Sequence, residues 1–309
     1  MSQARRREHS PTPRTDPSLG ATTVTACWSP LAQPAHGVVC TTSDIVGGVP
    51  PHMHARHHVG VVEQGTATLQ SEGRRWTVHA GDLIWHAPRQ IHSMCSEHCH
   101  CRWIELDEQA VERIAAASGT CVPEETRVFS DGSRAAEFVE LHRRLERGAV
   151  TRSAATTLAG LIAAEAGARG IITAWPPVLT PELERCRIAI RNRYAESVRL
   201  IDLARIAGMS LFYLARRFAR ALSVPPHTYL LHLRVAWAQT LLRRGLSGSR
   251  VAYEVGFSDQ SHCIRAHRRL LGVTPLTVLA LERELPAIAD GFARLPDTAM
   301  RAAASIWRP

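Results

Sequence analysis

Lysine is absent from this chain of 309 residues, so all 37 basic residues are arginine, set against 28 acidic residues. Long apolar runs are also missing, because the nearest stretch, residues 154–175, is interrupted by Glu165 and Arg169. A membrane-spanning helix needs about 20 predominantly apolar residues. No apolar core follows the arginines at positions 5–7, so neither a membrane span nor a secretory signal is expected.

The eight cysteines lack the spacing of a disulfide scaffold. Without a signal peptide, free thiols and a reducing cytoplasm are expected. The common nucleophile, phosphate-loop and dinucleotide motifs are also missing. These absences argue against a secreted scaffold and against the common classes of enzyme.

The positive charge is concentrated in one segment. Residues 180–285 contain 17 arginines and 8 acidic residues, whereas the rest of the chain is balanced at 20 of each. Binding to DNA phosphates, with release of counterions, requires such a local excess. A solvated basic surface is the alternative, and the helical pattern of the same segment weighs against it.

Two short helices joined by a turn are predicted inside this basic segment. Apolar residues recur at helical spacing at Leu200, Leu203, Ala204 and Ala207. Gly208 ends this helix, and Ser210 is suited to cap the next one, which buries Leu214 and Phe218. A short second helix rich in arginine is typical of a helix-turn-helix unit.

A second copy of the pattern follows 48 residues later before the turn and 49 residues later after it, so its turn is one residue longer. The matching positions are Ala204 and Ala252, Gly208 and Gly256, Arg216 and Arg265, Arg220 and Arg269, Pro226 and Pro275. Between the copies, Tyr229 to Arg244 is predicted to form one long helix that ends at Gly245. Two such units can enter successive major grooves if they lie about 34 Å apart.

Many ordered positions across roughly a third of the chain carry a family resemblance. They are Leu203-Ala204, Ala207–Ser210, Leu214, Arg216, Phe218, Pro226, Tyr229, Leu233-Arg234, Ala238, Leu241-Leu242, Gly245, Val255–His262, Arg265, Gly272 and Thr274-Pro275. The run Gly256–His262 is the most specific part. On these residues the segment resembles the DNA-binding domain of AraC/XylS-family bacterial transcription regulators. The resemblance implies double-stranded DNA, RNA polymerase and a second copy of the chain as partners.

The resemblance also implies which side chains meet DNA. Base edges would be read by Phe212, Tyr213, Ala215, Arg216 and Arg217 from the first unit and by Gln260, Ser261, His262 and Arg265 from the second. Phosphates would be held by Arg220, Arg268 and Arg269. For each arginine the alternative is a solvated helix face. The second unit departs from the family, because Cys263 and His267 stand where large apolar residues are usual, so looser packing is expected there.

The N-terminal half changes to short strands separated by glycine and proline. Residues 58–63 and 66–70 are predicted to form a strand pair around Gly65, and residues 76–79 and 83–85 another around Gly81-Asp82. This pattern indicates a sandwich or small barrel. The resemblance here is to the cupin-type effector-binding domain of many AraC/XylS members, and it is carried by Pro51–His54, Gly65, Gly73, Gly81-Asp82, Pro88 and His92.

Cupin enzymes hold a metal with a His-x-His pair, a nearby acid and a later histidine. Here His52, His54 and His92 match the histidines, but His58 and Val59 occupy the place of the acid and Glu63 comes too late. The catalytic site with two histidines and one carboxylate is therefore degraded. The effector, a small molecule or a metal ion, is expected inside the barrel, at His52, His54, His58, Glu63, Trp85 and His92.

The same region is rich in side chains that bind metals, including the run His98–Cys101. The histidines His52, His54 and His92 are the candidate ligands for an effector ion such as zinc, nickel, cobalt or copper. The alternative is a barrel lined with polar aromatic residues and a surface turn rich in cysteine and histidine, without metal.

The predicted fold is an α+β multidomain chain with a small cupin-like β-barrel and helices, followed by an all-α domain with two helix-turn-helix units on a connecting helix. The expected segments are a disordered arm (1–22), the barrel (23–106), a helical linker for dimerisation (107–175), the DNA-binding domain (176–285) and a tail (286–309). The predicted function is effector-responsive, sequence-specific regulation of transcription. A cupin oxygenase or isomerase fused to a DNA-binding domain and a non-specific architectural DNA binder are the alternatives. The effector, the operator and the choice between activation and repression stay open.

Overall fold

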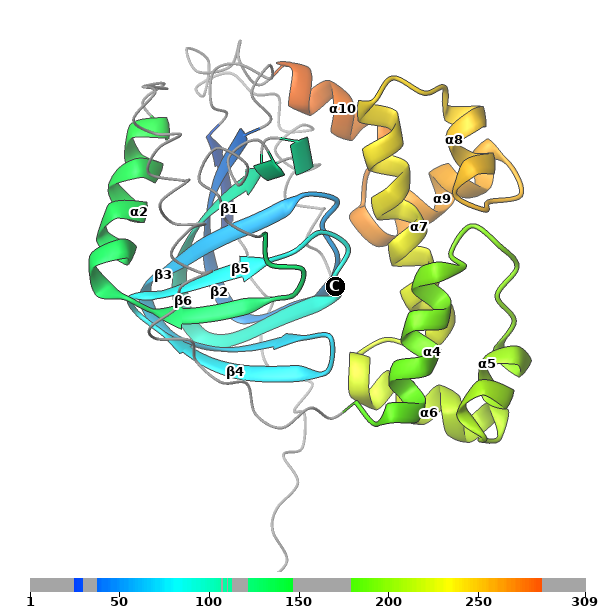
Figure 1. Cartoon of the computed structure of the whole chain (residues 1–309). Coiled ribbons are helices and arrows are strands. Elements are labelled where there is room, and N and C mark those ends of the chain that lie inside the picture. The colour runs from blue at the N-terminus through cyan, green and yellow to red at the C-terminus, as the bar shows by residue number, and fades with distance from the viewer. Residues whose placement is uncertain are drawn as a thin grey trace, which may run out of the picture.

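The computed structural model describes residues 25–29, 38–106, 108–109, 111–112, 122–146 and 179–284. Seven strands form one antiparallel sheet in the order β1-β2-β6-β3-β5-β7, and β4 pairs with β3. The strands are β1 (Thr25–Ser29), β2 (Val38–His52), β3 (His57–Ser71), β4 (Arg74–His79), β5 (Asp82–His86), β6 (His92–Leu106) and β7 (Arg127–Ser130). Figure 1 shows this sheet curled on one side of the molecule and the C-terminal helices on the other.

The turn predicted at Gly65 is wrong, because residues 57–71 form one strand. Gly65 lies at an irregularity of the β3–β6 pairing and has a φ of +86°. A Cβ atom there would lie 2.2 Å from the carbonyl oxygen of His98, so only glycine fits this bulge. The pairing predicted between residues 76–79 and 83–85 is also wrong, because β4 and β5 each pair with a different half of β3.

Apolar residues cover both faces of the sheet. On one face, Val59 and Leu83 pack against Phe138 and Leu141 of helix α2 (Gly132–Glu146), so the apolar side of α2 contacts the barrel. The other face encloses the barrel interior around Leu69. Helix α2 agrees with the helical character predicted for residues 107–175. The prediction is wrong at residues 127–130, which form strand β7 and whose alternating side chains reach both cores.

Several predictions concern residues outside the described ranges. They are the disordered arm (1–22), the part of the helical linker after residue 146, and the C-terminal tail (286–309).

The C-terminal part consists of helices. They are α4 (Pro181–Asn192), α5 (Leu200–Ala207), α6 (Leu211–Leu222), α7 (Pro226–Arg243), α8 (Gly248–Glu254), α9 (Gln260–Leu271) and α10 (Pro275–Glu284). Helix α7 is the predicted connecting helix, and Gly245 follows it with a φ of +86°. In Figure 1, α4 and α7 lie nearer the sheet than α5, α8 and α9. The α+β architecture is thus confirmed, and no helix in the described ranges is both long and apolar enough to cross a bilayer.

Candidate DNA interface and effector site

The first helix-turn-helix unit forms as the local sequence predicts. Helix α5 ends at Gly208, which is left-handed with a φ of 63°, as glycine tolerates. The Ser210 hydroxyl then accepts a hydrogen bond from the Tyr213 amide at 3.3 Å and caps α6. Leu214 and Phe218 are fully buried, so the opposite face of α6 remains available to DNA.

The second unit repeats this arrangement with a longer turn. Two residues separate Gly256 from the cap Asp259, whereas one separates Gly208 from Ser210, in agreement with the sequence offset. The Asp259 carboxylate accepts the amide of His262 at 2.7 Å. Gly256 has a φ of +84°, and a Cβ there would lie 2.4 Å from the carbonyl oxygen of Ala195.

The two units are joined through the loop after α4. Arg234 of the connecting helix donates hydrogen bonds of 2.7 Å to the carbonyl oxygens of Tyr194 and Glu196. The close approach of Gly256 to Ala195 holds the second unit against the same loop. This loop therefore contacts elements of both units.

The predicted DNA-contacting side chains are all accessible to solvent. The exposed ones are Phe212, Tyr213, Arg216, Arg220, Gln260, Ser261, Arg265, Arg268 and Arg269, and the partly exposed ones are Ala215, Arg217 and His262. Phe212 is 72% exposed, which is unusual for a large apolar residue and leaves a free surface on α6. Arg217 donates a hydrogen bond of 3.0 Å to the Tyr213 hydroxyl, so these two side chains are held together.

Cys263 and His267 occupy the core positions of α9 that correspond to Leu214 and Phe218 of α6. Both are buried, and a ring nitrogen of His267, Nδ1, lies 3.1 Å from the Cys263 carbonyl oxygen. The other ring nitrogen, Nε2, is buried and has no hydrogen-bond partner among the described residues. Burial lowers the pKa of His267 to about 4 and raises the pKa of Cys263 to about 11, so both side chains are neutral at pH 7.

His52, His54 and His92 come together at the end of the barrel that faces the helices. Each contributes one donor atom, and these three atoms lie within 4.8 Å of one another. The Nδ1 atoms have partners: that of His52 lies 2.9 Å from the Pro50 carbonyl oxygen, and that of His92 lies 3.0 Å from the Gln90 carbonyl oxygen. Such contacts set the tautomer and leave Nε2 as the atom for a metal.

His54 completes the same pattern. Its Nδ1 lies 3.4 Å from the carboxylate of Glu105, while its Nε2 is buried without a hydrogen-bond partner in the described part of the chain. An orphaned buried nitrogen facing two further imidazoles is the arrangement that a metal ion would satisfy. The three histidines therefore fit a divalent transition-metal ion.

The electrostatics favour neutral imidazoles at His52 and His92. Burial lowers the pKa of His52 and of His92 well below its usual value, and the neighbouring histidines lower both further. Burial by itself would raise the pKa of Glu105, but the hydrogen bond with His54 and the adjacent positive charges outweigh it, so this pKa is lowered. The cluster thus combines two neutral imidazoles, those of His52 and His92, with an ionised carboxylate, Glu105, beside His54.

Glu105 and His86 belong to this cluster although the sequence pattern did not select them. Glu105 lies on β6 directly opposite His58. Because Glu105 is far from the His-x-His pair along the chain, the sequence spacing does not reveal this pairing. His86 stacks on His92 with ring centroids 3.9 Å apart. Trp103 stacks on His58, and its indole occupies the space where a Cβ of Gly60 would lie.

Two residues predicted for the effector site lie elsewhere. The Glu63 carboxylate contacts Arg102 at 2.6 Å and Arg143 of α2 at 2.9 Å, outside the histidine cluster. Trp85 packs in the core between the sheet and α2, because it directly precedes His86 on β5 and its side chain therefore points to the opposite face of the strand. The structure therefore gathers His52, His54, His58 and His92, but not Glu63 or Trp85.

Comparison with known proteins gives two family matches. Residues 203–280 match a family of helix-turn-helix domains, and residues 43–162 match the AraC-like ligand-binding domain. The HTH-type transcriptional regulator YbfI of Bacillus subtilis is 27% identical over 223 residues, which cover 69% of this chain and 80% of YbfI. The thermoregulatory protein LcrF of Yersinia pestis is 23% identical over 72% of this chain and 88% of its own. The regulator ExsA of Pseudomonas aeruginosa is 32% identical over 30% of this chain and 34% of its own.

Proposed function

The chain belongs to the AraC/XylS family of DNA-binding transcription regulators, and we propose that an effector bound among the barrel histidines controls how it binds its operator. The family matches cover both the ligand-binding part and the helix-turn-helix part of the chain. The relatives are named as regulators, and the cupin-enzyme alternative has no support among them. The Glu105 carboxylate contacts Nδ1 of His54, so its position does not support a catalytic site in which a carboxylate is a metal ligand.

Sequence-specific contacts are assigned to the two recognition helices, α6 and α9. The exposed face of α6, with Phe212, Tyr213 and Arg216, supports this assignment for the first unit. Arg216 is suited to the O6 and N7 edge of guanine, and Tyr213 to a thymine methyl group. Gel-shift titration at fixed salt, with random DNA as competitor, tests it: specific binding has to survive an excess of competitor that removes an architectural binder.

The effector is a divalent transition-metal ion held by His52, His54 and His92. Two observations carry this proposal: the three donor atoms lie within 4.8 Å of one another, and Nε2 of His54 is buried without a hydrogen-bond partner among the described residues. When bound, the ion would serve as a structural cross-link between the segments that carry its ligands. Zinc, nickel, cobalt and copper suit imidazole ligands.

Metal analysis of protein purified without an affinity tag, followed by equilibrium titration with Zn²⁺ and Ni²⁺, tests the effector site. Tight binding that is lost in the His52→Ala and His54→Ala variants is expected. His98→Ala is the matched control, because His98 is exposed on β6 away from the cluster. Absence of tight binding in the unmodified chain would reject the metal effector.

A homodimer in the cytoplasm that recruits RNA polymerase is part of the same proposal and rests on family membership. Analytical ultracentrifugation with and without operator DNA measures the stoichiometry. A monomer on an operator with one pair of half-sites would contradict the dimer.

A further inference from the structure

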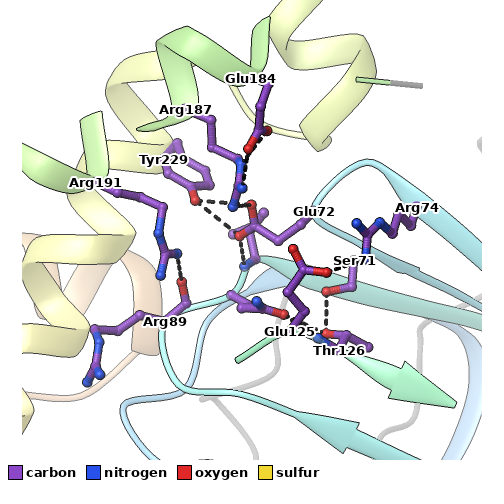
Figure 2. A network of polar contacts seen from close by, with 12 residues as sticks. Ser71, Glu72, Arg74, Arg89, Glu125, Thr126, Glu184, Arg187, Arg191 and Tyr229 are labelled. Carbon is purple, nitrogen blue, oxygen red and sulfur yellow. Dashed lines mark hydrogen bonds and ion pairs between the residues drawn. The ribbon is translucent and has the colours of Figure 1, made fainter. Parts of the chain in front are cut away.

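Glu72 connects the barrel to the DNA-binding helices. It lies in the turn between β3 and β4, and its side chain is 10% exposed. Its carboxylate accepts a hydrogen bond of 2.9 Å from Arg187 of α4 and hydrogen bonds of 3.1 Å from the Tyr229 hydroxyl of α7 (Figure 2). A single, largely buried carboxylate thus joins the sheet to two helices that support the recognition helices.

The same residue is bonded to the segment that precedes the metal ligand His92. The Glu72 amide donates to the Ile91 carbonyl oxygen at 3.1 Å, and the Ile91 amide donates to the Glu72 carboxylate at 2.9 Å. Glu72 therefore stands between Arg187 and Tyr229 on one side and the neighbour of His92 on the other.

Residues 89–92, here named the relay segment, touch the effector site directly. The Gln90 carbonyl oxygen lies 3.0 Å from Nδ1 of His92, and the Arg89 amide donates to the His54 carbonyl oxygen at 2.8 Å. Two of the three candidate ligands are thus positioned by this segment. Displacement of His54 or His92 would therefore move the backbone of the relay segment.

The relay segment also contacts the DNA-binding helices directly, through residues other than Glu72. Arg191 of α4 donates to the Arg89 carbonyl oxygen at 2.7 Å (Figure 2), and the Arg89 guanidinium lies 4.0 Å from the ring centroid of Trp237 on α7. Ile91, together with Met53 between the two other ligands, is buried in the apolar core that α4, α6 and α7 share. Each ligand-bearing segment therefore places an apolar residue in the core of the first helix-turn-helix unit.

From this arrangement we propose that Glu72 is a latch between the two halves, and that metal occupancy of the histidine cluster strengthens it through the relay segment. The coupling rests on the metal effector proposed above, whereas the latch itself does not. An ion that binds His54 and His92 fixes both ends of the relay segment and so holds Ile91 where Glu72 engages it. Because the carboxylate is buried against a guanidinium, removal of its charge weakens docking strongly.

The test compares Glu72→Gln with Glu184→Gln in the full chain by hydrogen exchange and mass spectrometry. Glu184 contacts the same arginine at 2.6 Å but within α4, so it is the matched control for loss of a partner of Arg187. In Glu72→Gln, exchange in α4 and in the relay segment should rise by about tenfold or more. Tyr229→Phe, which keeps the ring and removes one donor to the carboxylate, should give a smaller rise in the same peptides.

Zn²⁺ titration then measures the coupling. In the wild type, Zn²⁺ should slow exchange in α4 and shift operator affinity, and both effects should fall by at least about threefold in Glu72→Gln while Zn²⁺ affinity is retained. Equal exchange in Glu72→Gln and Glu184→Gln would overturn the latch. Zn²⁺ effects that survive intact in Glu72→Gln would overturn the coupling. If the wild type binds neither Zn²⁺ nor Ni²⁺, the metal effector and the coupling are rejected together, and the exchange comparison still decides the latch.

Discussion

Replacement of His267 by leucine is expected to strengthen the second helix-turn-helix unit and to reduce its sensitivity to acid. His267 is fully buried in α9, and its Nε2 has no hydrogen-bond partner among the residues that the structure describes. A buried nitrogen without a partner costs about 1–3 kcal/mol. Leucine removes this cost, so the opening free energy of α9 at pH 7.5 should rise by a similar amount.

The pH dependence follows from the pKa of about 4 in the folded chain. The unfolded value is about 6.5, so the unfolded state takes up the proton first as the pH falls. This histidine therefore leaves the free energy of unfolding unchanged with pH above pH 6.5 and lowers it progressively as the pH falls to 4. The whole loss is about 3 kcal/mol, and about 2 kcal/mol of it occurs between pH 7.5 and 5.0.

Hydrogen exchange of α9 peptides at pH 7.5 and 5.0, corrected for intrinsic exchange rates, measures this difference. Wild-type protection in α9 should fall about 30-fold more than protection in His267→Leu. Comparison of the two proteins removes the contribution of other buried histidines, such as His57 and His232, whose pKa values are also lowered to about 4 by burial.

A control variant separates burial from the mere presence of histidine. His262 lies on the same helix and is partly exposed, so His262→Asn should leave the pH dependence of α9 close to that of the wild type. If wild type and His267→Leu lose equal protection between the two pH values, the buried neutral imidazole does not govern the stability of this unit.

Three further predictions concern the DNA-binding part. Arg216→Ala should weaken specific binding by about 1–3 kcal/mol in gel-shift titrations, and Arg265→Ala by less, because a weaker core supports α9; a larger loss for Arg265→Ala would contradict this order. Gly256→Ala should destabilise the second unit by more than about 1 kcal/mol, since the φ of Gly256 is +84° and the new Cβ would lie 2.4 Å from the Ala195 carbonyl oxygen. An unchanged midpoint of thermal unfolding would refute this prediction. Arg269→Ala should reduce the slope of log affinity against log salt by about 1 and affect all DNA sequences alike, whereas a sequence-dependent loss would assign Arg269 to a base edge.

The helix-turn-helix units were predictable because their determinants are local. Gly208 and Gly256 adopt the left-handed or turn conformations that the sequence pattern requires, and Ser210 caps α6 through a residue three positions away. The burial of Leu214 and Phe218 follows from helical spacing alone. The charge excess over the same segment is a property of composition and needs no coordinates.

The effector site was predictable only in part, because strand register and bulges decide which side chains meet. The His-x-His pair and His92 were identifiable from spacing, but Glu105 reaches His54 only through the pairing of β3 with β6. The phase of alternation and the bulge near Gly65 likewise direct Glu63 and Trp85 away from the cluster.

The sequence by itself determined the family resemblance, the two-part architecture and the helix-turn-helix units, since these depend on residues close together along the chain. Tertiary structure decided the contacts within the histidine cluster and between the barrel and the DNA-binding helices, because they join residues that are far apart in sequence. The Glu72 carboxylate meets Tyr229 across 157 positions, and no periodicity or motif encodes such a contact. Burial of a charge at that junction, which links the barrel to the DNA-binding helices, is a consequence of how the two halves pack.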